Sequence, residues 1–233
     1  MKIYRHELKY FLNDIDKELL KQRLDCYLEH DRHAESGEYI IRSMYFDDAW
    51  ATAYEDKVNG LNKRKKYRIR IYNNSDKIIR LECKNKVDQY ILKVSAALSR
   101  EECDKILAGD CGFLLKREEK LCHEFYFDYV TTQLRPATIV DYVREPYVLK
   151  AGDVRITFDM GVKGASPFYS MFDNDVPMYD VLEDGRLILE VKYTEFCPTI
   201  IKELIQSVST EFTAASKYVL CYEKVGFLYA DAF

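Results

Sequence analysis

One segment of the chain restricts the possible folds more than any other: Arg64–Tyr72, which reads RKKYRIRIY. Successive side chains of a β-strand point to opposite faces, so one face of this segment collects four cations: Arg64, Lys66, Arg68 and Arg70. Like charges on one strand face repel one another unless water or an anion screens them. The segment therefore predicts a strand whose charged face meets either solvent or a bound anion.

Neighbouring segments repeat this charge pattern in the same phase. Ile78–Lys86 places four charged side chains opposite Leu81 and Cys83, namely Arg80, Glu82, Lys84 and Lys86. Tyr90–Leu98 adds Lys93. Three further segments share faces in the same way: Arg5, Glu7 and Lys9; Arg155, Thr157 and Asp159; Glu190 and Lys192. The pattern Glu-x-Lys thus recurs three times beside apolar residues that suit a core.

A single strand of this kind is also typical of a sheet that is packed on one side and solvated on the other. Solvated faces are usually rich in Thr, Ser and Gln, whereas these faces are almost purely Arg, Lys and Glu. If five or more such strands close into a barrel, the charges point into a lumen and helices cover the apolar outside. We therefore expect an α+β fold dominated by antiparallel strands, in a single domain over residues 1–233.

The remaining elements follow from periodicity and capping residues. Asn13–Glu29 predicts an amphipathic helix, capped by Asn13 or Asp14, with an apolar face of Ile15, Leu19, Leu20, Leu24, Tyr27 and Leu28. Ser99 and Glu102 form a capping box that opens a helix to about Ala108. Further helices are predicted at Ala49–Lys57, through Leu114–Leu134 and within Pro198–Glu223. Further strands are predicted at residues 3–12, Tyr39–Asp47, Thr138–Arg144, Val154–Met160 and Leu187–Tyr193.

Composition excludes several classes of protein. A net charge of −4 argues against a general nucleic-acid or membrane-surface binder, so any polyanion site must be a local concentration of positive charge. No stretch approaches eighteen apolar residues, and no membrane segment is expected. The seven cysteines show no Cys-x-x-Cys pair or zinc-like spacing, which favours free thiols in a reducing compartment. We therefore expect a cytoplasmic protein.

The residue types on the charged faces suit phosphate chemistry. Arginine grips phosphate oxygens with a planar fork, and lysine adds a compact point charge. Carboxylates beside them suit a hard divalent cation such as Mg²⁺ or Mn²⁺, which prefers oxygen ligands. The candidate metal ligands are Glu7, Glu82 and Glu190. The chain has no P-loop, Gly-x-Gly-x-x-Gly, His-Glu-x-x-His or Gly-x-Ser-x-Gly motif.

Eight short motifs occur in series over nearly the whole chain. They are R-x-E-x-K at Arg5–Lys9, S-x-Y-F-D at Ser43–Asp47, K-Y-R-I-R at Lys66–Arg70, L-E-x-K at Leu81–Lys84, Y-x-R at Tyr142–Arg144, V-R-I-T-x-D at Val154–Asp159, L-E-x-K at Leu189–Lys192 and S-K-Y at Ser216–Tyr218. In this order they resemble the VTC (vacuolar transporter chaperone) domain, the polyphosphate-polymerase branch of the triphosphate tunnel metalloenzyme superfamily. The resemblance implies an eight-stranded β-barrel, or triphosphate tunnel, with flanking helices.

The resemblance also implies a ligand set. The tunnel would bind the triphosphate of ATP and a growing polyphosphate chain together with Mn²⁺ or Mg²⁺, and Glu190 would be the main metal ligand. The residues expected to carry catalysis are Lys9, Arg68, Arg70, Lys84, Arg155 and Glu190. Further phosphate-binding residues are expected to be Arg5, Lys66, Arg80, Lys93, Arg144, Lys192 and Lys217.

The chain departs from its relatives at two positions. Arg5 stands where the hydrolytic and cyclase members carry a first Glu, which favours the polymerase branch and removes one potential metal ligand or base. Ser95 stands where relatives often carry an Arg that contacts phosphate.

Several functions remain open at this level. The leading hypothesis is a polyphosphate polymerase that transfers the γ-phosphate of ATP to a polyphosphate chain. The alternatives are a metal-dependent triphosphatase of the same fold and a non-catalytic polyphosphate or nucleotide sensor. A groove for single-stranded nucleic acid is disfavoured by the acidic net charge.

Overall fold

The computed structural model describes residues 5–32, 34, 36–88 and 90–228. Its eight long strands are β1 (His6–Asn13), β3 (Tyr39–Asp47), β4 (Lys63–Tyr72), β5 (Ser75–Val87), β6 (Tyr90–Leu98), β7 (Arg135–Leu149), β8 (Val154–Ala165) and β10 (Arg186–Tyr193). Three short strands are β2 (Glu29–His30), β9 (Tyr179–Asp180) and β11 (Glu211–Phe212). All pairings are antiparallel, within one eleven-stranded sheet of order β11-β1-β10-β8-β7-β3-β4-β5-β6; β2 pairs with β7 and β9 with β8.

The sheet curls until its two edges touch, but it does not close into a continuous ladder. Arg5 and Ile91 exchange backbone hydrogen bonds of 3.2 Å, and among the described residues this is the one bridge between the β1 and β6 edges. Further along β1, the free edge pairs instead with β11 at Tyr10 and Phe11. The predicted α+β fold with antiparallel strands is confirmed, whereas a closed eight-stranded barrel is too strict a description because β11 occupies part of the closing edge.

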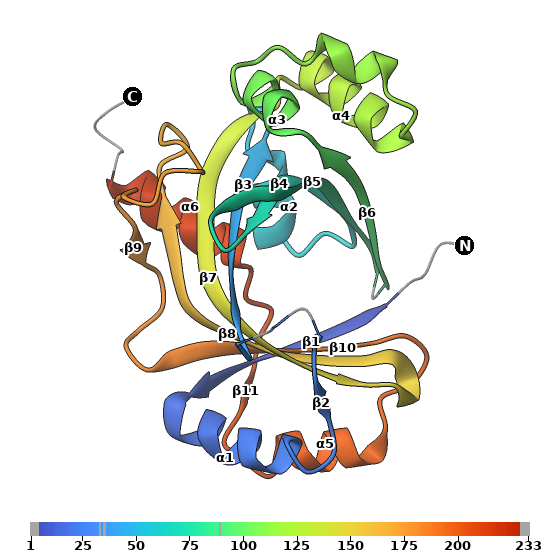
Figure 1. Ribbon diagram of the computed structural model, residues 1–233, viewed down its shortest axis with the longest axis vertical. Coiled ribbons are helices and arrows are strands. Elements are labelled where there is room, and N and C mark those ends of the chain that lie inside the picture. The colour runs from blue at the N-terminus through green and yellow to red at the C-terminus, as the bar shows by residue number, and fades with distance from the viewer. Residues whose placement is uncertain (1–4, 33, 35, 89, 229–233) are drawn as a thin grey trace.

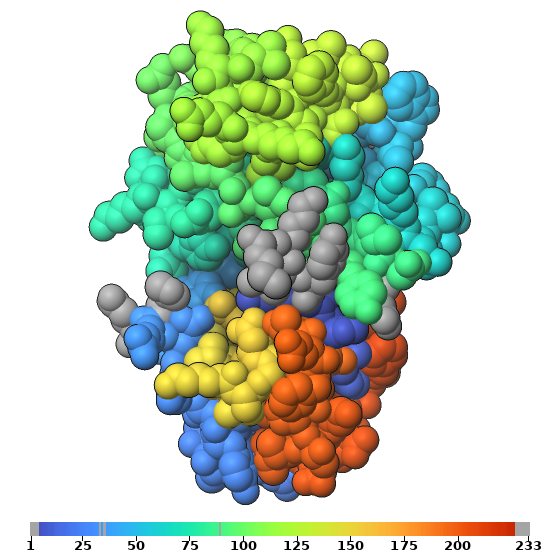
Figure 2. All heavy atoms as spheres, turned by 90° about the vertical axis from the view of Figure 1, so that its right-hand side faces the viewer, coloured from blue at the N-terminus to red at the C-terminus, as the bar shows by residue number. Residues whose placement is uncertain are grey.

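Six α-helices surround this sheet in the described part of the chain. They are α1 (Asp14–Leu24), α2 (Thr52–Val58), α3 (Arg100–Leu107), α4 (Lys120–Thr131), α5 (Thr199–Gln206) and α6 (Lys217–Leu228), with short 3₁₀ turns at Gly112–Lys116 and Ala151–Asp153. Figure 1 shows α3 and α4 above the strands β3–β6, and α1 and α5 below β1, β8 and β10. Figure 2 shows the two halves stacked one above the other, the green upper half on the yellow, orange and blue lower half.

The apolar faces of the strands point outward, toward these helices. One core packs Ile69, Leu81 and Met44 of the upper strands against Phe125 of α4. A second core packs the lower strands, through residues such as Phe158 and Leu189, against Leu20 and Leu24 of α1 and Ile201 of α5. Because the helices cover the outer faces, the charged phase of every long strand is turned inward.

Two helix predictions hold at the level of single hydrogen bonds. The side chain of Asn13 accepts a 2.8 Å bond from the Asp16 backbone N–H and so caps α1. Ser99 and Glu102 form the predicted capping box of α3. Residues 3 and 4 of the first predicted strand lie outside the described residues.

The apolar face predicted for the first helix is too wide. Ile15 is 76 % exposed, Leu19 45 % and Tyr27 57 %, while Leu20, Leu24 and Leu28 are buried. Helix α1 ends at Leu24, before the predicted end at Glu29, so Tyr27 and Leu28 lie after it, and Leu20 and Leu24 are its buried residues in the lower core.

The predicted helix over 114–134 is also wrong in length. It divides into a 3₁₀ turn and α4, because Arg117 adopts an extended conformation. Its guanidinium donates to Glu102, Glu119 and the Ala97 carbonyl, which holds the chain in that conformation. In the described part of the chain no helix has the length and apolarity needed to cross a membrane. All seven cysteines are free and six are buried.

Candidate functional site

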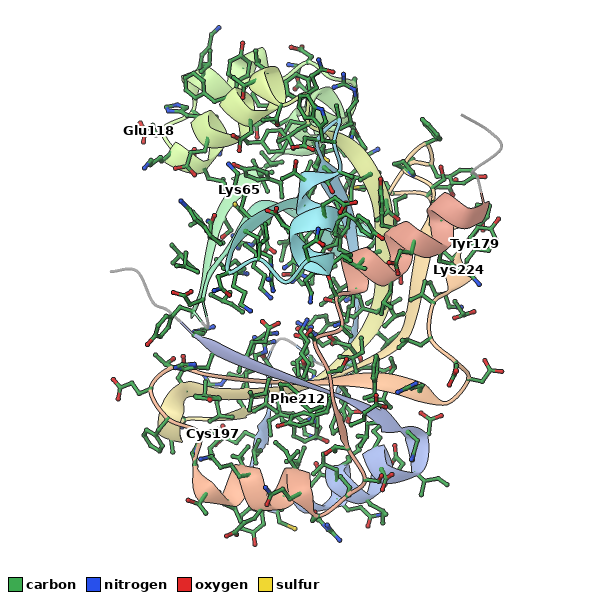
Figure 3. All side chains as sticks on the ribbon, turned by 180° about the vertical axis from the view of Figure 1, so that it is seen from behind. Lys65, Glu118, Tyr179, Cys197, Phe212 and Lys224 are labelled. Atoms are coloured by element: carbon green, nitrogen blue, oxygen red, sulfur yellow. The ribbon has the colours of Figure 1, made fainter. Side chains whose placement is uncertain are left out.

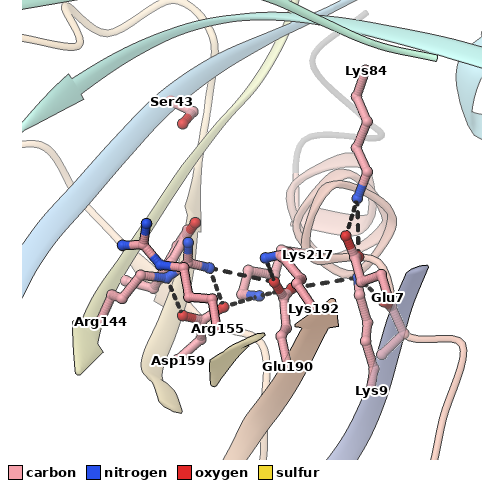
Figure 4. Close-up of polar contacts among 12 residues, drawn as sticks. Glu7, Lys9, Ser43, Lys84, Arg144, Arg155, Asp159, Glu190, Lys192 and Lys217 are labelled. Carbon is pink, nitrogen blue, oxygen red and sulfur yellow. Dashed lines mark hydrogen bonds and ion pairs between the residues drawn. The ribbon is translucent and has the colours of Figure 1, made fainter. Parts of the chain in front are cut away.

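The inner face of the curled sheet gathers the charged side chains of strands that are far apart in the sequence. We call the space enclosed by the inner faces of the eight long strands the tunnel. Figure 3 shows the side chains of the upper and lower strands facing one another across it, while Lys65, in the opposite phase, lies on the side of α4. Figure 4 shows the convergence of Glu7, Lys9, Lys84, Arg144, Arg155, Asp159, Glu190, Lys192 and Lys217.

Glu190 of β10 lies at the centre of this convergence and is 5 % exposed. Lys217, at the first position of α6, donates to its Oε1 at 2.9 Å, and Lys192 donates to its Oε2. Lys9 lies 3.5 Å from the same carboxylate. Burial opposes the charged form, but the surrounding ammonium groups outweigh it and hold the pKa of Glu190 well below its ordinary value.

Asp159 of β8 is a second buried carboxylate beside Glu190. Arg144 of β7 grips it with two hydrogen bonds of 2.6 and 2.7 Å, and Lys217 forms an ion pair with it. Lys217 therefore bridges Asp159 and Glu190. Sequence reasoning placed Asp159 on the correct face but did not select it as a site residue, although its phase with Arg155 was the available signal.

Glu7 of β1 continues this ion-pair chain toward the upper half. Lys84 of β5 donates to both of its oxygens, at 2.9 and 2.8 Å, and Lys9 lies 3.3 Å away. Burial raises the pKa of Glu7, but Lys84 and Lys9 outweigh it and the pKa lies well below its ordinary value. Carboxylates and ammonium groups thus alternate along Glu7, Lys9, Glu190, Lys217 and Asp159.

Glu82 of β5 organises a second cluster, on the upper strands. Arg68 grips it through Nε and Nη2 at 2.8 and 2.6 Å, and Lys93 donates at 2.9 Å. Arg70 is 3.9 Å from the same carboxylate. Tyr45 of β3 accepts a 2.8 Å bond from Arg68 and was not predicted as a site residue, although it lies within the S-x-Y-F-D motif.

Two cations of the tunnel keep unused donors. Arg155 of β8 donates to Tyr39 at 3.0 Å and pairs with Asp31 at 2.7 Å, yet its buried Nε has no partner. Arg80 of β5 is exposed and pairs with no group in the described part of the chain. The hydroxyl of Thr157 is likewise buried without a partner. Buried unpaired donors are costly unless a ligand satisfies them.

The end of the tunnel near the β5–β6 turn carries cations with few acidic neighbours. Lys66 donates to Ser216 at 3.0 Å and lies 4.9 Å from the ring centre of Tyr218, and no carboxylate of the described residues pairs with it. Burial, with the nearby charges of Lys9 and Lys84, lowers the pKa of Lys66 to about 6. Burial and the charge of Arg64 lower the pKa of Lys57 of α2 to about 8.

Helix α6 covers this end of the tunnel. The ring of Tyr218 stacks on Tyr45 at 5.1 Å, and its hydroxyl donates to Asp47. Gly164 of β8 lies so near α6 that an added Cβ would be 2.9 Å from the Cβ of Cys221. The helix is therefore seated directly on the inner face of β8, an arrangement that sequence patterns did not reveal.

Arg5 is the predicted phosphate-binding residue that the structure places apart from the others. Its guanidinium forms a 3.0 Å ion pair with Asp153 outside the tunnel, and the side chain is 47 % exposed. The other predicted residues lie on the inner face of the sheet, except Lys217, which reaches Glu190 and Asp159 from α6. No group of three or more His, Cys, Asp or Glu side chains in the described part of the chain has the arrangement of a metal site.

Comparisons with known proteins agree with this geometry. A family model described as VTC domain matches residues 4–225. No curated protein sequence matches the chain. A protein from Hippeastrum, described as an adenylyl cyclase candidate with a dominant triphosphatase activity, has a similar structure, with a TM-score of 0.58, 13 % identity and 97 % of each chain covered.

Two further solved structures are similar. An adenylate cyclase candidate from Bacillus halodurans has a TM-score of 0.56 and 13 % identity, over 93 % of this chain and 96 % of the other. A Pyrococcus horikoshii protein has a TM-score of 0.50 and 17 % identity, over 95 % of this chain and 99 % of the other. At these identities the similarity is one of fold.

Proposed function

The chain belongs to the VTC-domain family, and from this premise we propose that it is a metal-dependent polyphosphate polymerase. The observation that carries the proposal is the composition of the inner face, where Lys and Arg outnumber the carboxylates and where Arg155 and Arg80 keep unused donors. A phosphate chain supplies the missing negative charge and the missing acceptors.

In the proposed reaction, the terminal phosphate oxygen of a polyphosphate chain attacks the γ-phosphorus of ATP. The new P–O bond forms as the bond between the γ-phosphorus and the β–γ bridging oxygen breaks, and ADP leaves with that oxygen. No protein nucleophile is required. Arg68 and Arg70, two residues apart on β4, hold the phosphoryl oxygens, and Lys84 and Lys9 stabilise charge on the leaving and attacking oxygens.

Carboxylates of the tunnel offer the oxygen ligands that Mg²⁺ or Mn²⁺ prefers. Lysine ammonium groups already pair with them, so a metal ion would have to compete with these lysines. The oxygens of Glu190 and Asp159 converge on the ammonium of Lys217, so a divalent ion held by Glu190 would compete with Lys217 for this carboxylate. We favour Glu190 as the main ligand and Glu7, on the same ion-pair chain, as the second. Glu82 is enclosed by Arg68 and Lys93. A bound metal would neutralise charge on the phosphates.

A triphosphatase is the second candidate, and the position of α6 favours it. A helix that covers one end of the tunnel shortens the path for a long acceptor chain, whereas water needs no such path. The cations Lys57, Lys66 and Lys86 near this end favour an acceptor chain instead, because they lack carboxylate partners in the described part of the chain.

One assay separates these functions. Pure protein is incubated with ATP and Mn²⁺ or Mg²⁺, and the products are resolved on a polyphosphate gel and by orthophosphate release. Chain product supports the polymerase. Stoichiometric orthophosphate without chain product, at either metal, overturns it in favour of the triphosphatase. Binding of polyphosphate without turnover indicates a sensor.

Glu190→Gln tests the metal role in the same assay. The change keeps size but removes a charge that a hard cation needs. We expect metal-dependent turnover to fall by at least a hundredfold, on the order of 3 kcal/mol, while metal-free polyphosphate binding is kept or improved. Unchanged turnover would show that Glu190 is only an ion-pair partner of Lys217 and Lys192.

A further inference from the structure

The two ends of the tunnel differ in chemistry. Antiparallel pairing places the β4–β5 and β5–β6 turns at opposite ends of β5. Lys66 and Lys86 lie toward the β5–β6 turn, at the end that α6 covers through Tyr218. The end at the β4–β5 turn carries a different set, in which two tyrosines accompany two arginines: Tyr39, Tyr72, Arg80 and Arg155.

Tyr39 and Tyr72 form an aromatic pair on the inner face. Tyr39 is in phase with Ser43 and Tyr45, the partners of Arg70 and Arg68. The two rings meet edge to face, with centroids 5.9 Å apart and an angle of 60°, and both side chains are half-buried. Each ring therefore keeps accessible surface at the rim.

The position of this pair is fixed by the adjacent turn. Asn73 and Asn74 adopt the left-handed conformation, with φ of 50° and 52°, which Asn tolerates better than most residues. The Asn73 backbone N–H donates to the Ile40 carbonyl at 2.9 Å, and the Asn73 side chain accepts from the Ile40 N–H at 2.8 Å. These bonds join the start of β3 to the end of β4, so the rim is already formed without ligand.

Cationic groups with free donors lie beside the rings. The hydroxyl of Tyr39 accepts from Arg155, whose buried Nε lacks a partner. Arg80 is the inner-face cation of β5 nearest the β4–β5 turn and is exposed. Arg155 also pairs with Asp31, so its spare donor is Nε. A flat ring surface next to guanidinium groups with unused donors matches a molecule in which an aromatic base is joined to phosphates.

We propose that the Tyr39–Tyr72 rim is a nucleoside subsite. The base of a nucleoside triphosphate stacks on the accessible ring surface of the pair, Arg155 and Arg80 hold the phosphates nearest the ribose, and the terminal phosphate points inward to Arg68 and Arg70. The subsite rests on the proposed function. It also assigns the two ends of the tunnel: the nucleotide binds at the Tyr39–Tyr72 rim, and the acceptor chain lies at the end that α6 covers.

The test compares ATP with tripolyphosphate, which has the same phosphate chain but no base. Binding of each is measured by calorimetry, in wild type and in Tyr72→Leu. We expect Tyr72→Leu to weaken ATP binding on the order of tenfold, the loss of one stacked base, and to leave tripolyphosphate binding within about twofold. Tyr72→Phe keeps the ring and should restore ATP binding. Tyr90→Leu, in the outward phase of β6, is the matched control and should leave the binding of both ligands unchanged.

The outcomes are distinguishable. Suppose that wild type binds both ligands. If Tyr72→Leu then weakens the binding of both equally, or leaves the binding of both unchanged, the nucleoside subsite is overturned while the phosphate tunnel stands. If wild type binds neither ligand, the proposed function is overturned and the subsite with it. Thermal unfolding of each variant shows whether a general loss of binding reflects a loss of folded protein.

Discussion

Lys66 of β4 differs from Arg68 and Lys217 because no carboxylate pairs with it in the described part of the chain. Arg68 and Lys217 each have acidic partners that outweigh the cost of burial and raise their pKa values. For Lys66, burial and the charges of Lys9 and Lys84 act in the same direction, which is why its pKa falls to about 6 from an ordinary value of 10.5. Protonated Lys66 therefore destabilises the fold unless a bound anion pairs with it.

This cost has a predictable pH dependence. Because the folded pKa lies below the unfolded one, the penalty is complete below about pH 6 and is relieved as pH rises toward 10.5. We expect Lys66→Met to raise the melting temperature by a few degrees at pH 6, on the order of 1–2 kcal/mol, with a gain that shrinks toward pH 10. Thermal unfolding over this range measures it. Lys65→Met, one residue away and paired with Asp128 on the outer side, is the control and should show no such gain. A gain independent of pH would contradict the assignment.

At the scale of elements, α6 brings Lys217 between two carboxylates and covers one end of the tunnel. The helix can lie there because Gly164 of β8 has no side chain: an added Cβ would be 2.9 Å from the Cβ and 3.1 Å from the Cα of Cys221. The second atom belongs to the backbone, so a rotamer change cannot relieve the contact. The position of Lys217, and with it the Glu190 site, depends on this close approach.

We therefore expect Gly164→Ala to destabilise the protein by about 1–3 kcal/mol, the usual cost of overpacking, and to weaken tripolyphosphate binding. Denaturant unfolding and calorimetry measure the two effects. At Gly226 in α6 an added Cβ meets no atom within 4 Å, so Gly226→Ala should be neutral or stabilising by up to about 1 kcal/mol, since Ala favours helix. Equal effects of the two changes would show that α6 does not depend on contact with β8.

At the scale of the whole molecule, the tunnel is a concentration of positive charge in a protein of net charge −4. The upper and lower halves have separate cores and share a continuous ladder through β8, β7 and β3. On the other side they meet at the Arg5–Ile91 bridge and the Lys84–Glu7 ion pair. A polyanion that contacts both halves should hold them together.

A ligand that binds only the folded state stabilises it by mass action. At a hundred times its dissociation constant, tripolyphosphate should add about 2.7 kcal/mol, a rise in melting temperature of about 5–11 °C for a chain of this size. Thermal unfolding with and without the ligand measures the shift. Orthophosphate at equal ionic strength is the control and should give a much smaller rise. No shift with millimolar tripolyphosphate would count against the tunnel as a polyanion site.

The sequence by itself determined which side chains of the long strands share the inner face of the sheet. Alternation along a strand is local, so the phase of Arg68, Arg70, Glu82 and Lys84 could be predicted from the chain alone, as could the caps at Asn13 and Ser99. Only the tertiary structure decided which charges became partners. Arg144 meets Asp159, Lys217 meets Glu190, Tyr39 meets Tyr72, and Arg5 turns outward to Asp153. These contacts depend on strand register and on the position of α6 against β8. Both are set by packing between segments that are distant in the sequence, so no local pattern predicts them.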